Sequence, residues 1–322
     1  MSAARATLDL ALVDLRELRG ADLRPLLVQQ DQRWRELFSW DFTASSQAIQ
    51  NFLNSRTLHG FALVRGGMPV GYCYFVLDQS KALVGDIFLS DRNPSPSAQR
   101  ALLVRTLETA AAYPGVSRVE GQLLGLNGEL GPESIFHRAL NVFPRWFMMR
   151  DQLRAIRADR PEPANHSFLP WGEHYLAPAA DLIASAYRGH DDSQINDQYR
   201  DPAGARRFLS NTTRHTGCGA FLPAASWVAI QPGDGRISGI CLATRVHQDA
   251  GHVTQICVSP RDRGMGVGRE LLRRTLLSLR ACACDTASLT VTASNTGALS
   301  LYQQMGFRPT QRFSAFVWES GR

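Results

Sequence analysis

The 322-residue sequence predicts an α/β fold, of the mixed α+β kind, in two tandem domains. The length suits two domains of roughly 150 residues each. The segment "ADRPEPANH", residues 158–166, is polar, contains two prolines and interrupts the periodic pattern, as a linker does. The same order of strands and helices precedes and follows it, which indicates a repeated unit. We therefore expect domains at 1–157 and 167–322, each with a mixed, mostly antiparallel central sheet flanked by helices.

Apolar periodicity and turn residues place the elements of the first domain. A strand is expected over 10–18, and two helices follow it. The segment "GFALVRGGMPVGYCYFVLD" predicts a hairpin that turns on Gly66 and Gly67. The remaining elements are a fourth strand, a third helix and a fifth strand, so that the helices and later strands lie at 22–40, 45–56, 82–90, 98–113 and 117–125.

The second domain repeats this order with clearer patterns. It begins with a strand, a helix, a polar loop and a second helix, and continues with three strands, the first two joined by the turn "PGDGR". Two strand and helix pairs and the final strand "FSAFVWE" complete it. The first six of these elements are expected at 167–171, 174–188, 202–215, 225–231, 236–246 and 251–258.

The stretch "RGMGVGRELL", residues 263–272, joins a predicted buried strand to an amphipathic helix. Glycine is tolerated at this density mainly where φ is positive or where a ligand approaches the backbone. A helix N-terminus after such a loop offers free N–H groups and a positive dipole end, which together bind phosphate. The loop lacks the third-glycine spacing of a dinucleotide fingerprint and the lysine of a P-loop.

The pattern that remains, Arg263-x-x-Gly266-x-Gly268, resembles the pyrophosphate loop of the GCN5-related N-acetyltransferase (GNAT) superfamily. About 30 residues later, "NTGALSLYQQMGF" is similar to that family's second acyl-CoA motif, N-x-x-A-x-x-L-Y-x-x-x-G-F. The resemblance implies tandem GNAT domains that take acetyl-CoA as co-substrate and transfer its acetyl group directly to an amine. The expected strand order of both halves agrees with that fold.

The first half lacks both motifs. Its strand-to-helix loop, "SDRNPSPSAQR", has no glycine, and Pro94 and Pro96 remove two N–H donors. The segment "ESIFHRALNVFPRWF" stands where the second motif is expected. We interpret this half as a degenerate GNAT-like domain, and a structural α+β domain of another fold is the alternative.

Composition excludes several classes of protein. The net charge of +6 is spread over both halves, and almost all of the basic residues are arginines. This even distribution argues against a nucleic-acid surface and fits a modest attraction for anionic ligands. No export signal or apolar membrane span is evident, so we expect a cytoplasmic protein that does not contact membranes. Six cysteines without C-x-x-C spacing indicate reduced, structural thiols and no metal site. The oligomeric state is not predicted.

The resemblance implies roles for particular residues. The co-substrate would contact backbone groups of the strand before the loop, the loop itself and the second motif, namely Ile256, Cys257, Val258, Arg263, Gly264, Met265, Gly266, Val267, Gly268, Asn295 and Tyr302. Tyr302 would protonate the leaving thiolate, because a phenol stays protonated at neutral pH. Its position in an apolar helical stripe also suits a core aromatic. Asn295 suits a CoA contact, a helix N-cap or both.

The general base is less defined by the sequence. The strand "GHVTQICV" has no carboxylate, although many relatives place a glutamate there. His252, six residues before Val258, is the candidate, because imidazole titrates near neutrality. A capped or solvated histidine, with deprotonation through water, is the alternative.

The polar loop "HDDSQINDQYRDP", residues 190–202, lies where the family admits its acceptor substrate. Asp191, Asp192 and Asp197 are expected to attract a cationic amine on which Tyr199 could pack. A solvated loop before a helix start at Asp201 is the alternative. The preferred prediction is an N-acetyltransferase of a small-molecule amine; a protein or peptide N-acetyltransferase and a non-catalytic acyl-CoA sensor or scaffold remain alternatives.

Overall fold

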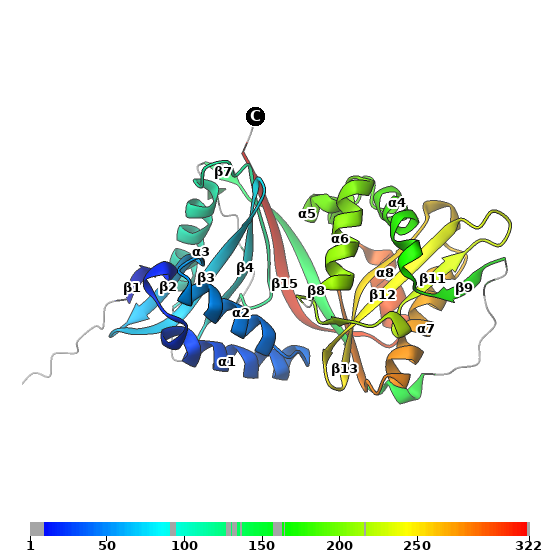
Figure 1. The fold of residues 1–322 in the computed structure, drawn as a ribbon, viewed down its shortest axis with the longest axis horizontal. Coiled ribbons are helices and arrows are strands. Elements are labelled where there is room, and N and C mark those ends of the chain that lie inside the picture. The colour runs from blue at the N-terminus through cyan, green and yellow to red at the C-terminus, as the bar shows by residue number, and fades with distance from the viewer. Residues whose placement is uncertain are drawn as a thin grey trace, which may run out of the picture. The chain divides into compact units, whose positions relative to one another are not determined.

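The fold is described from a computed structural model, which covers residues 10–90, 95–126, 130, 134–135, 137–156, 163, 165–215 and 217–320 (Figure 1). Two compact units form. The first contains residues 1–35, 42–143 and 313–322, and the second contains residues 36–41 and 144–312. Most of the predicted linker at 158–166, together with Pro94, lies outside the described residues.

Each unit takes one strand from the other half of the sequence. Residues Arg145 to Arg150 of β8 (Asn141–Arg150) pair with β14 (Thr286–Thr292) in the second unit. Residues Ser314 to Glu319 of β15 (Arg308–Glu319) pair with β5 (Arg118–Leu123) in the first. The compact units therefore differ from the contiguous segments 1–157 and 167–322, because strand pairing covers a sheet edge without regard to chain order.

The first unit is a mixed sheet with helices on both faces. Its strand order is β1-β2-β3-β4-β5-β15, and only β4 and β5 pair in parallel. The strands not yet named are β1 (Leu10–Asp14), β2 (His59–Arg65), β3 (Met68–Asp78) and β4 (Lys81–Leu89). The helices are α1 (Gly20–Phe38), α2 (Thr43–Asn54), α3 (Pro96–Ala111) and the short η1 (Leu15–Glu17), with a small pair β6 (Ser134–Ile135) and β7 (Arg138–Ala139).

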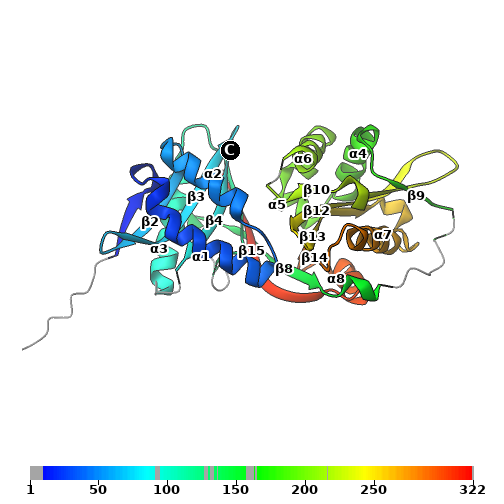
Figure 2. The same ribbon diagram turned by 60° about the horizontal axis from the view of Figure 1, so that its bottom comes forward.

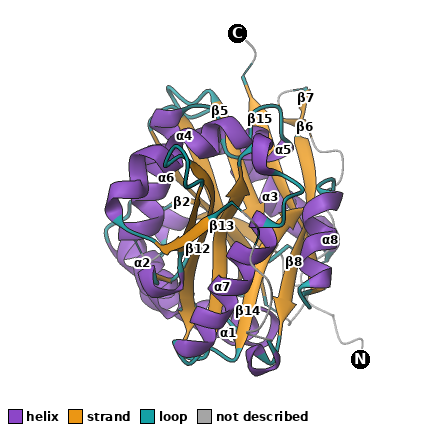
Figure 3. Ribbon diagram, turned by 90° about the vertical axis from the view of Figure 1, so that its right-hand side faces the viewer, coloured by secondary structure: helices purple, strands orange, loops and turns teal. Residues whose placement is uncertain are grey.

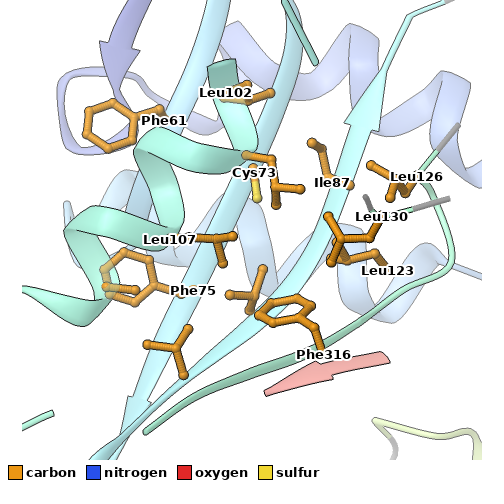
Figure 4. Packing of buried hydrophobic residues seen from close by; sticks show 14 of the residues in the cluster. Phe61, Cys73, Phe75, Ile87, Leu102, Leu107, Leu123, Leu126, Leu130 and Phe316 are labelled. Carbon is orange, nitrogen blue, oxygen red and sulfur yellow. The ribbon is translucent and has the colours of Figure 1, made fainter. Parts of the chain in front are cut away.

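Alternate residues of the strands bury opposite faces of this sheet. Figure 4 shows Leu102 and Leu107 of α3 packed against Cys73 and Phe75 of β3. The neighbouring Tyr72 belongs to a second cluster, with α1 and α2, on the other face. The hydrophobic effect thus anchors one helix on one face and two on the other.

The second unit has the same architecture. Its strand order is β8-β14-β13-β12-β11-β9, with β10 paired to the far part of β12, and only β13 and β14 are parallel. The strands not yet named are β9 (Ser167–Pro170), β10 (Ala220–Phe221), β11 (Trp227–Ile230), β12 (Ile237–His247) and β13 (Ala250–Val258). The α-helices are α4 (Leu176–Ala186), α5 (Asp191–Ile195), α6 (Pro202–Arg214), α7 (Val267–Ala281) and α8 (Thr296–Gln304). Short helical turns are η2 (Leu153–Ala155), η3 (Glu173–Tyr175), η4 (Asp197–Tyr199), η5 (Pro223–Ala225) and η6 (Pro260–Asp262).

Helices α4 and α6 cover one face of this sheet, and α7 and α8 cover the other (Figure 2). Figure 3 shows α7 in front of the strands on which it packs. A mostly antiparallel mixed sheet with helices on both faces confirms the predicted fold class. None of the described helices is long and apolar enough to cross a membrane.

In both units the parallel strand pair stops at a β-bulge. In the second unit, β13 and β14 pair only from Ala250–Thr286 to Val253–Leu289, and the next residue, Thr254, is an extra residue in the register with β12. In the first unit, β4 and β5 stop pairing at Val84, and Gly85 is the extra residue. A bulge bends and twists its strand. The parallel neighbours therefore separate beyond it, which leaves one edge of β13, and of β4, without a strand partner.

In the first unit a buried carboxylate fills this open edge. Asp86 Oδ1 accepts the N–H of Ile87 at 2.8 Å and the N–H of Gly125 at 3.3 Å, and Oδ2 accepts Gln30 Nε2 at 2.7 Å. Burial raises the pKa of Asp86 to about 7, although these three hydrogen bonds act in the opposite direction. The backbone at the separation of β4 and β5 is therefore already hydrogen-bonded by the chain itself.

The raised pKa of Asp86 predicts a pH-dependent stability. Between about pH 4 and pH 7 the folded state keeps a proton that the unfolded chain has lost, so stability falls as pH rises through this window. We expect a loss of up to about 3 kcal/mol between pH 5 and pH 8. Asp86→Asn should flatten this dependence in urea denaturation, whereas Asp78→Asn at an exposed strand end should keep it. An unchanged slope in the Asp86 variant would contradict the assignment.

Candidate functional site

The glycine-rich loop turns through left-handed backbone into α7. Gly264 has φ +80° and Gly266 has φ +84°, a region that side chains with a Cβ rarely adopt. Gly266 is the N-cap of α7. A Cβ on Gly268 would lie 3.3 Å from Cγ2 of Val258, so the helix start approaches the end of β13 closely. The glycines are therefore needed for the turn at two positions and for helix-to-strand packing at the third.

The first turn of α7 presents free N–H groups. Its first intrahelical bond runs from the N–H of Glu270 to the carbonyl of Gly266 at 3.0 Å. The N–H groups of Val267, Gly268 and Arg269 have no acceptor among the described residues, and no side chain caps the helix. Such groups at a positive dipole end bind an anion. The residues in the predicted loop thus lie at a helix start with unpaired N–H groups, and Met265 beside them is 57% exposed.

Ionic and backbone contacts hold the loop in place. Asp262 accepts from both terminal nitrogens of Arg236 at 2.9 and 3.2 Å. Burial alone would raise the pKa of Asp262, but the Arg236 guanidinium holds it below its usual value. Arg263 donates from Nη2 to the carbonyl of Ala186 at 2.8 Å, where α4 ends. This bond occupies one of the five guanidinium donors of Arg263.

The register of β13 decides which backbone groups face its open edge. Ser259 N–H donates to Ser238 O at 2.8 Å, so Cys257 and Ile240, two residues further along each strand, also form a hydrogen-bonded pair. Ile256 and Val258 lie at the alternate positions, and their N–H and C=O groups point away from β12. The open edge therefore carries the N–H groups of Ile256 and Val258. The N–H of Cys257 belongs to the β12 ladder, which corrects the prediction of an open N–H at that residue.

Tyr302 lies in α8, buried in the cluster that α7 forms with the sheet. Its ring meets Phe307 edge to face, with centroids 6.1 Å apart. Burial raises the pKa of Tyr302, and Cys241 and Asp192 act in the same direction. The hydroxyl has no hydrogen-bond partner among the described residues and stays protonated at neutral pH. A neutral phenol with an uncommitted O–H can donate to an anion.

Asn295 is the N-cap of α8. Its Oδ1 accepts the N–H of Ala298 at 3.1 Å, and its Nδ2 lies 3.2 Å from Nε2 of His190. This geometry shows the capping interpretation directly. The side chain joins the start of the helix that carries Tyr302 to the start of α5.

His252 lies in the paired part of β13, before the bulge. Its Nδ1 is 2.8 Å from Oγ of Ser288, and its ring packs against Trp40 and Phe147 with centroids 5.0 and 6.1 Å away. Burial lowers the pKa of His252 to about 4. Six residues of extended strand, about 20 Å, separate it from Val258. Aromatic packing and a serine partner thus surround the imidazole, and the role of His252 as general base stays a prediction.

The acidic residues of the 190–202 segment already have partners. Asp192 forms an ion pair with Arg145 at 2.8 Å and accepts from Oγ1 of Thr292 at 2.6 Å. Asp191 accepts from Oγ of Ser294 at 2.5 Å, and Asp197 begins η4. These contacts fasten α5 to the end of β14, so the predicted attraction of a free amine by Asp192 is weakened by its cation.

Tyr199 contacts two residues that the sequence did not predict, Gln255 and Tyr187. Its hydroxyl donates to Oε1 of Gln255 at 3.1 Å, and its ring stacks on Tyr187 with centroids 4.7 Å apart. A glutamine in a strand and a tyrosine at a helix end carry no motif. Only the alternation of side chains on β13, given the bulge, could have indicated Gln255.

Comparisons with known proteins agree with these motifs. A sequence profile of the Acetyltransferase (GNAT) family matches residues 194–307. The mycothiol acetyltransferase of Streptomyces griseus is 41% identical over 261 residues, which cover 76% of this chain and 79% of that protein. The match to the mycothiol acetyltransferase of Beutenbergia cavernae is 33% identical over 89 residues, 28% of this chain, and spans only 30% of that relative.

Solved structures show the same fold over nearly the whole chain. The tandem GNAT protein from the clavulanic acid biosynthesis pathway has a TM-score of 0.58 and 17% identity, and the match covers 98% of this chain and 99% of that chain. At this identity the likeness concerns the fold. It extends through both compact units, each of which has the bulge and strand separation described above.

The left-handed backbone of Gly266 predicts a local cost for a side chain. Gly266→Ala should lower the free energy of unfolding by about 1 kcal/mol, because the added Cβ disfavours positive φ. Gly297→Ala is the matched control, since Gly297 is helical, with open space around it, and alanine there should be neutral or stabilising. Urea denaturation of both variants measures the difference, and equal effects would contradict the assignment.

Proposed function

Because the chain belongs to the GNAT family of acetyltransferases, we propose that its second unit transfers the acetyl group of acetyl-CoA directly to a primary amine of a small molecule. The observation that carries this proposal is that two features lie close together. One is the helix start at Val267 with its unpaired N–H groups, and the other is the open strand edge at Ile256 and Val258. A nucleotide thioester needs both features.

The residues present fit acetyl-CoA as co-substrate. The pyrophosphate would accept from the N–H groups of residues 264–268, with Arg263 and Arg269 adding positive charge. The pantetheine arm would then run along the edge that β14 leaves. The end of β13 and the start of α7 are one short loop apart and pack at Gly268, so one extended molecule can reach both.

We assign two chemical roles. The N–H of Ile256, the first to face the open edge after the bulge, would donate to the thioester oxygen and stabilise the charge that develops there. Tyr302 would donate its proton to the departing thiolate. Burial keeps this phenol protonated at neutral pH, so its hydroxyl is available as a donor when the thiolate departs, and the proton that the amine loses restores it.

The amine must also lose a proton, and we assign this step to water. The described acidic residues near the site are engaged in ion pairs and caps, and His252 lies away from the open edge. The lack of a positioned base is the observation that favours a second candidate, a non-catalytic acyl-CoA sensor. A peptide amine is the other acceptor class for the same chemistry.

The first unit is proposed to bind no acyl-CoA. The N–H of Ile87, which corresponds to Ile256, already donates to Asp86. Its α3 begins with Pro96, and Ser95 caps the N–H of Ala98. Both features that support acetyl-CoA binding by the second unit are therefore absent or occupied in the first unit.

The name of the relatives, mycothiol acetyltransferase, supports acetylation of an amine and leaves the acceptor of this chain open.

Calorimetric titration with acetyl-CoA tests the proposal, and one site per chain is expected. Gly266→Val should abolish binding, because a side chain would distort the N–H cradle. Tyr302→Phe should leave Kd within about 3-fold but lower kcat by at least about 100-fold in an amine screen, since a positioned acid contributes that much.

Three results would contradict different parts of the proposal. Absence of acetyl-CoA binding by the intact chain would remove the co-substrate assignment. Full turnover in the Tyr302 variant would remove the acid, and binding without turnover for any amine would favour the sensor.

A further inference from the structure

Three polar side chains from three elements form a hydrogen-bonded chain that ends on the open strand edge. Tyr199, at the end of η4, donates to Oε1 of Gln255 at 3.1 Å. Nε2 of Gln255 donates to the hydroxyl of Tyr187 at 3.1 Å. Tyr187, the C-cap of α4, donates in turn to the carbonyl of Ile256 at 3.4 Å. We call these three side chains the Tyr–Gln–Tyr relay.

The direction of the relay is fixed by its protons. Each phenol has one proton, and the amide of Gln255 has a distinct accepting end and donating end. Burial raises the pKa of Tyr187 and of Tyr199, so both hydroxyls remain neutral donors. Gln255 is only 4% exposed, and water therefore does not compete effectively for its amide.

The relay acts on the residue that carries the proposed oxyanion donor. The C=O and N–H of Ile256 point to the same edge of β13. Past the bulge, no neighbouring strand holds that edge. The bond from Tyr187 to the carbonyl therefore replaces part of a missing ladder, and it limits rotation of the peptide units beside the N–H.

Two further contacts connect the relay to the rest of the site. Arg263 of the phosphate loop binds the carbonyl of Ala186, the residue before Tyr187. Tyr199 lies in the 190–202 segment and packs edge to face on Phe208 of α6, with centroids 5.0 Å apart. The C-terminal end of α4 thus contacts the glycine-rich loop through Arg263, β13 through Ile256 and the 190–202 segment through Tyr199.

We propose that Tyr187 and Gln255 are positioning residues, which aim the N–H of Ile256 at the thioester oxygen and link its orientation to the segment that carries Tyr199. This inference rests on the proposed function for the identity of the bound thioester. It requires neither residue to touch the reacting atoms. Its consequence is that polarisation of the thioester depends on side chains remote from it.

The test measures polarisation without an acceptor amine. The carbonyl ¹³C resonance of acetyl-CoA labelled at that carbon moves downfield when the oxygen accepts a hydrogen bond. We expect this shift when the label binds the intact chain. Tyr187→Phe keeps the ring stacked on Tyr199 but removes the hydroxyl, and should reduce the shift to about half while Kd by calorimetry stays within about 3-fold.

Matched variants separate positioning from general damage. Tyr175→Phe removes a hydroxyl from a tyrosine packed against the same apolar cluster as Tyr187 and should keep the full shift. Gln255→Leu should resemble Tyr187→Phe, and the double variant should lose no more than either alone, because the residues act in series. Losses that add, or an unchanged shift in Tyr187→Phe, would overturn the proposal.

Hydrogen exchange in the ligand-free protein distinguishes failure of this inference from failure of the proposed function. The amide of Cys257 shares a peptide plane with the carbonyl of Ile256, so Tyr187→Phe should speed its exchange by about 10-fold. If acetyl-CoA does not bind, the proposed function fails and this measurement still tests the relay. Unchanged exchange at Cys257 would overturn the relay itself.

Discussion

The β-bulge at Thr254 is the constraint on which the candidate site depends. Before it, β13 has a ladder on both edges; after it, β12 remains and β14 has departed. A strand inside a sheet normally has no free backbone groups, since unpaired buried N–H and C=O groups are costly. Here the bulge creates two such N–H groups, at Ile256 and Val258, within a short loop of the α7 N-terminus. Local disruption of the sheet thus places an unpaired strand edge close to the unpaired N–H groups at the start of α7.

Free backbone groups at that edge must be compensated, and the two units do this differently. In the first unit, the side chain of Asp86 accepts the N–H of its own neighbour, Ile87. In the second unit, the carbonyl of Ile256 is held by Tyr187, while its N–H has no side chain folded back on it. A ligand can complete the second arrangement but must displace a buried carboxylate from the first.

The sequence predicts features that depend on local order and misses those that depend on register. The turn at Gly264 and Gly266 follows from glycine spacing before an apolar helical stripe, and α7 follows from that stripe. The bulge has no such signature, since Thr254 differs little from a regular strand residue. Without the bulge, Cys257 and Ile256 could not be distinguished, and His252 could be placed near the reacting atoms, although the structure puts it among aromatic rings.

The pairing of the final strand is also not determined by local order. The final strand "FSAFVWE" has the alternation of a central strand, and nothing in that pattern says which parallel pair it joins. Both β5 and β14 present the same kind of edge, so the pattern of the final strand does not choose between them. The pairing is a property of two edges and two strands together, which no single segment encodes.

Side-chain length at one position accounts for much of the difference between the units. Asp86 and Gln255 both follow the bulged residue, at corresponding places in β4 and β13. The short carboxyl group of Asp86 accepts the N–H of the adjacent Ile87, the N–H of Gly125 and the amide of Gln30. Gln255 is one methylene longer and neutral, and it reaches the two tyrosines, accepting from one and donating to the other. The aspartate accepts the N–H of Ile87 at the open edge, whereas the glutamine supports Tyr187 on the carbonyl of Ile256 and leaves the N–H of Ile256 unpaired. Equivalent backbone N–H groups are therefore hydrogen-bonded within the chain in the first unit and available to a ligand in the second.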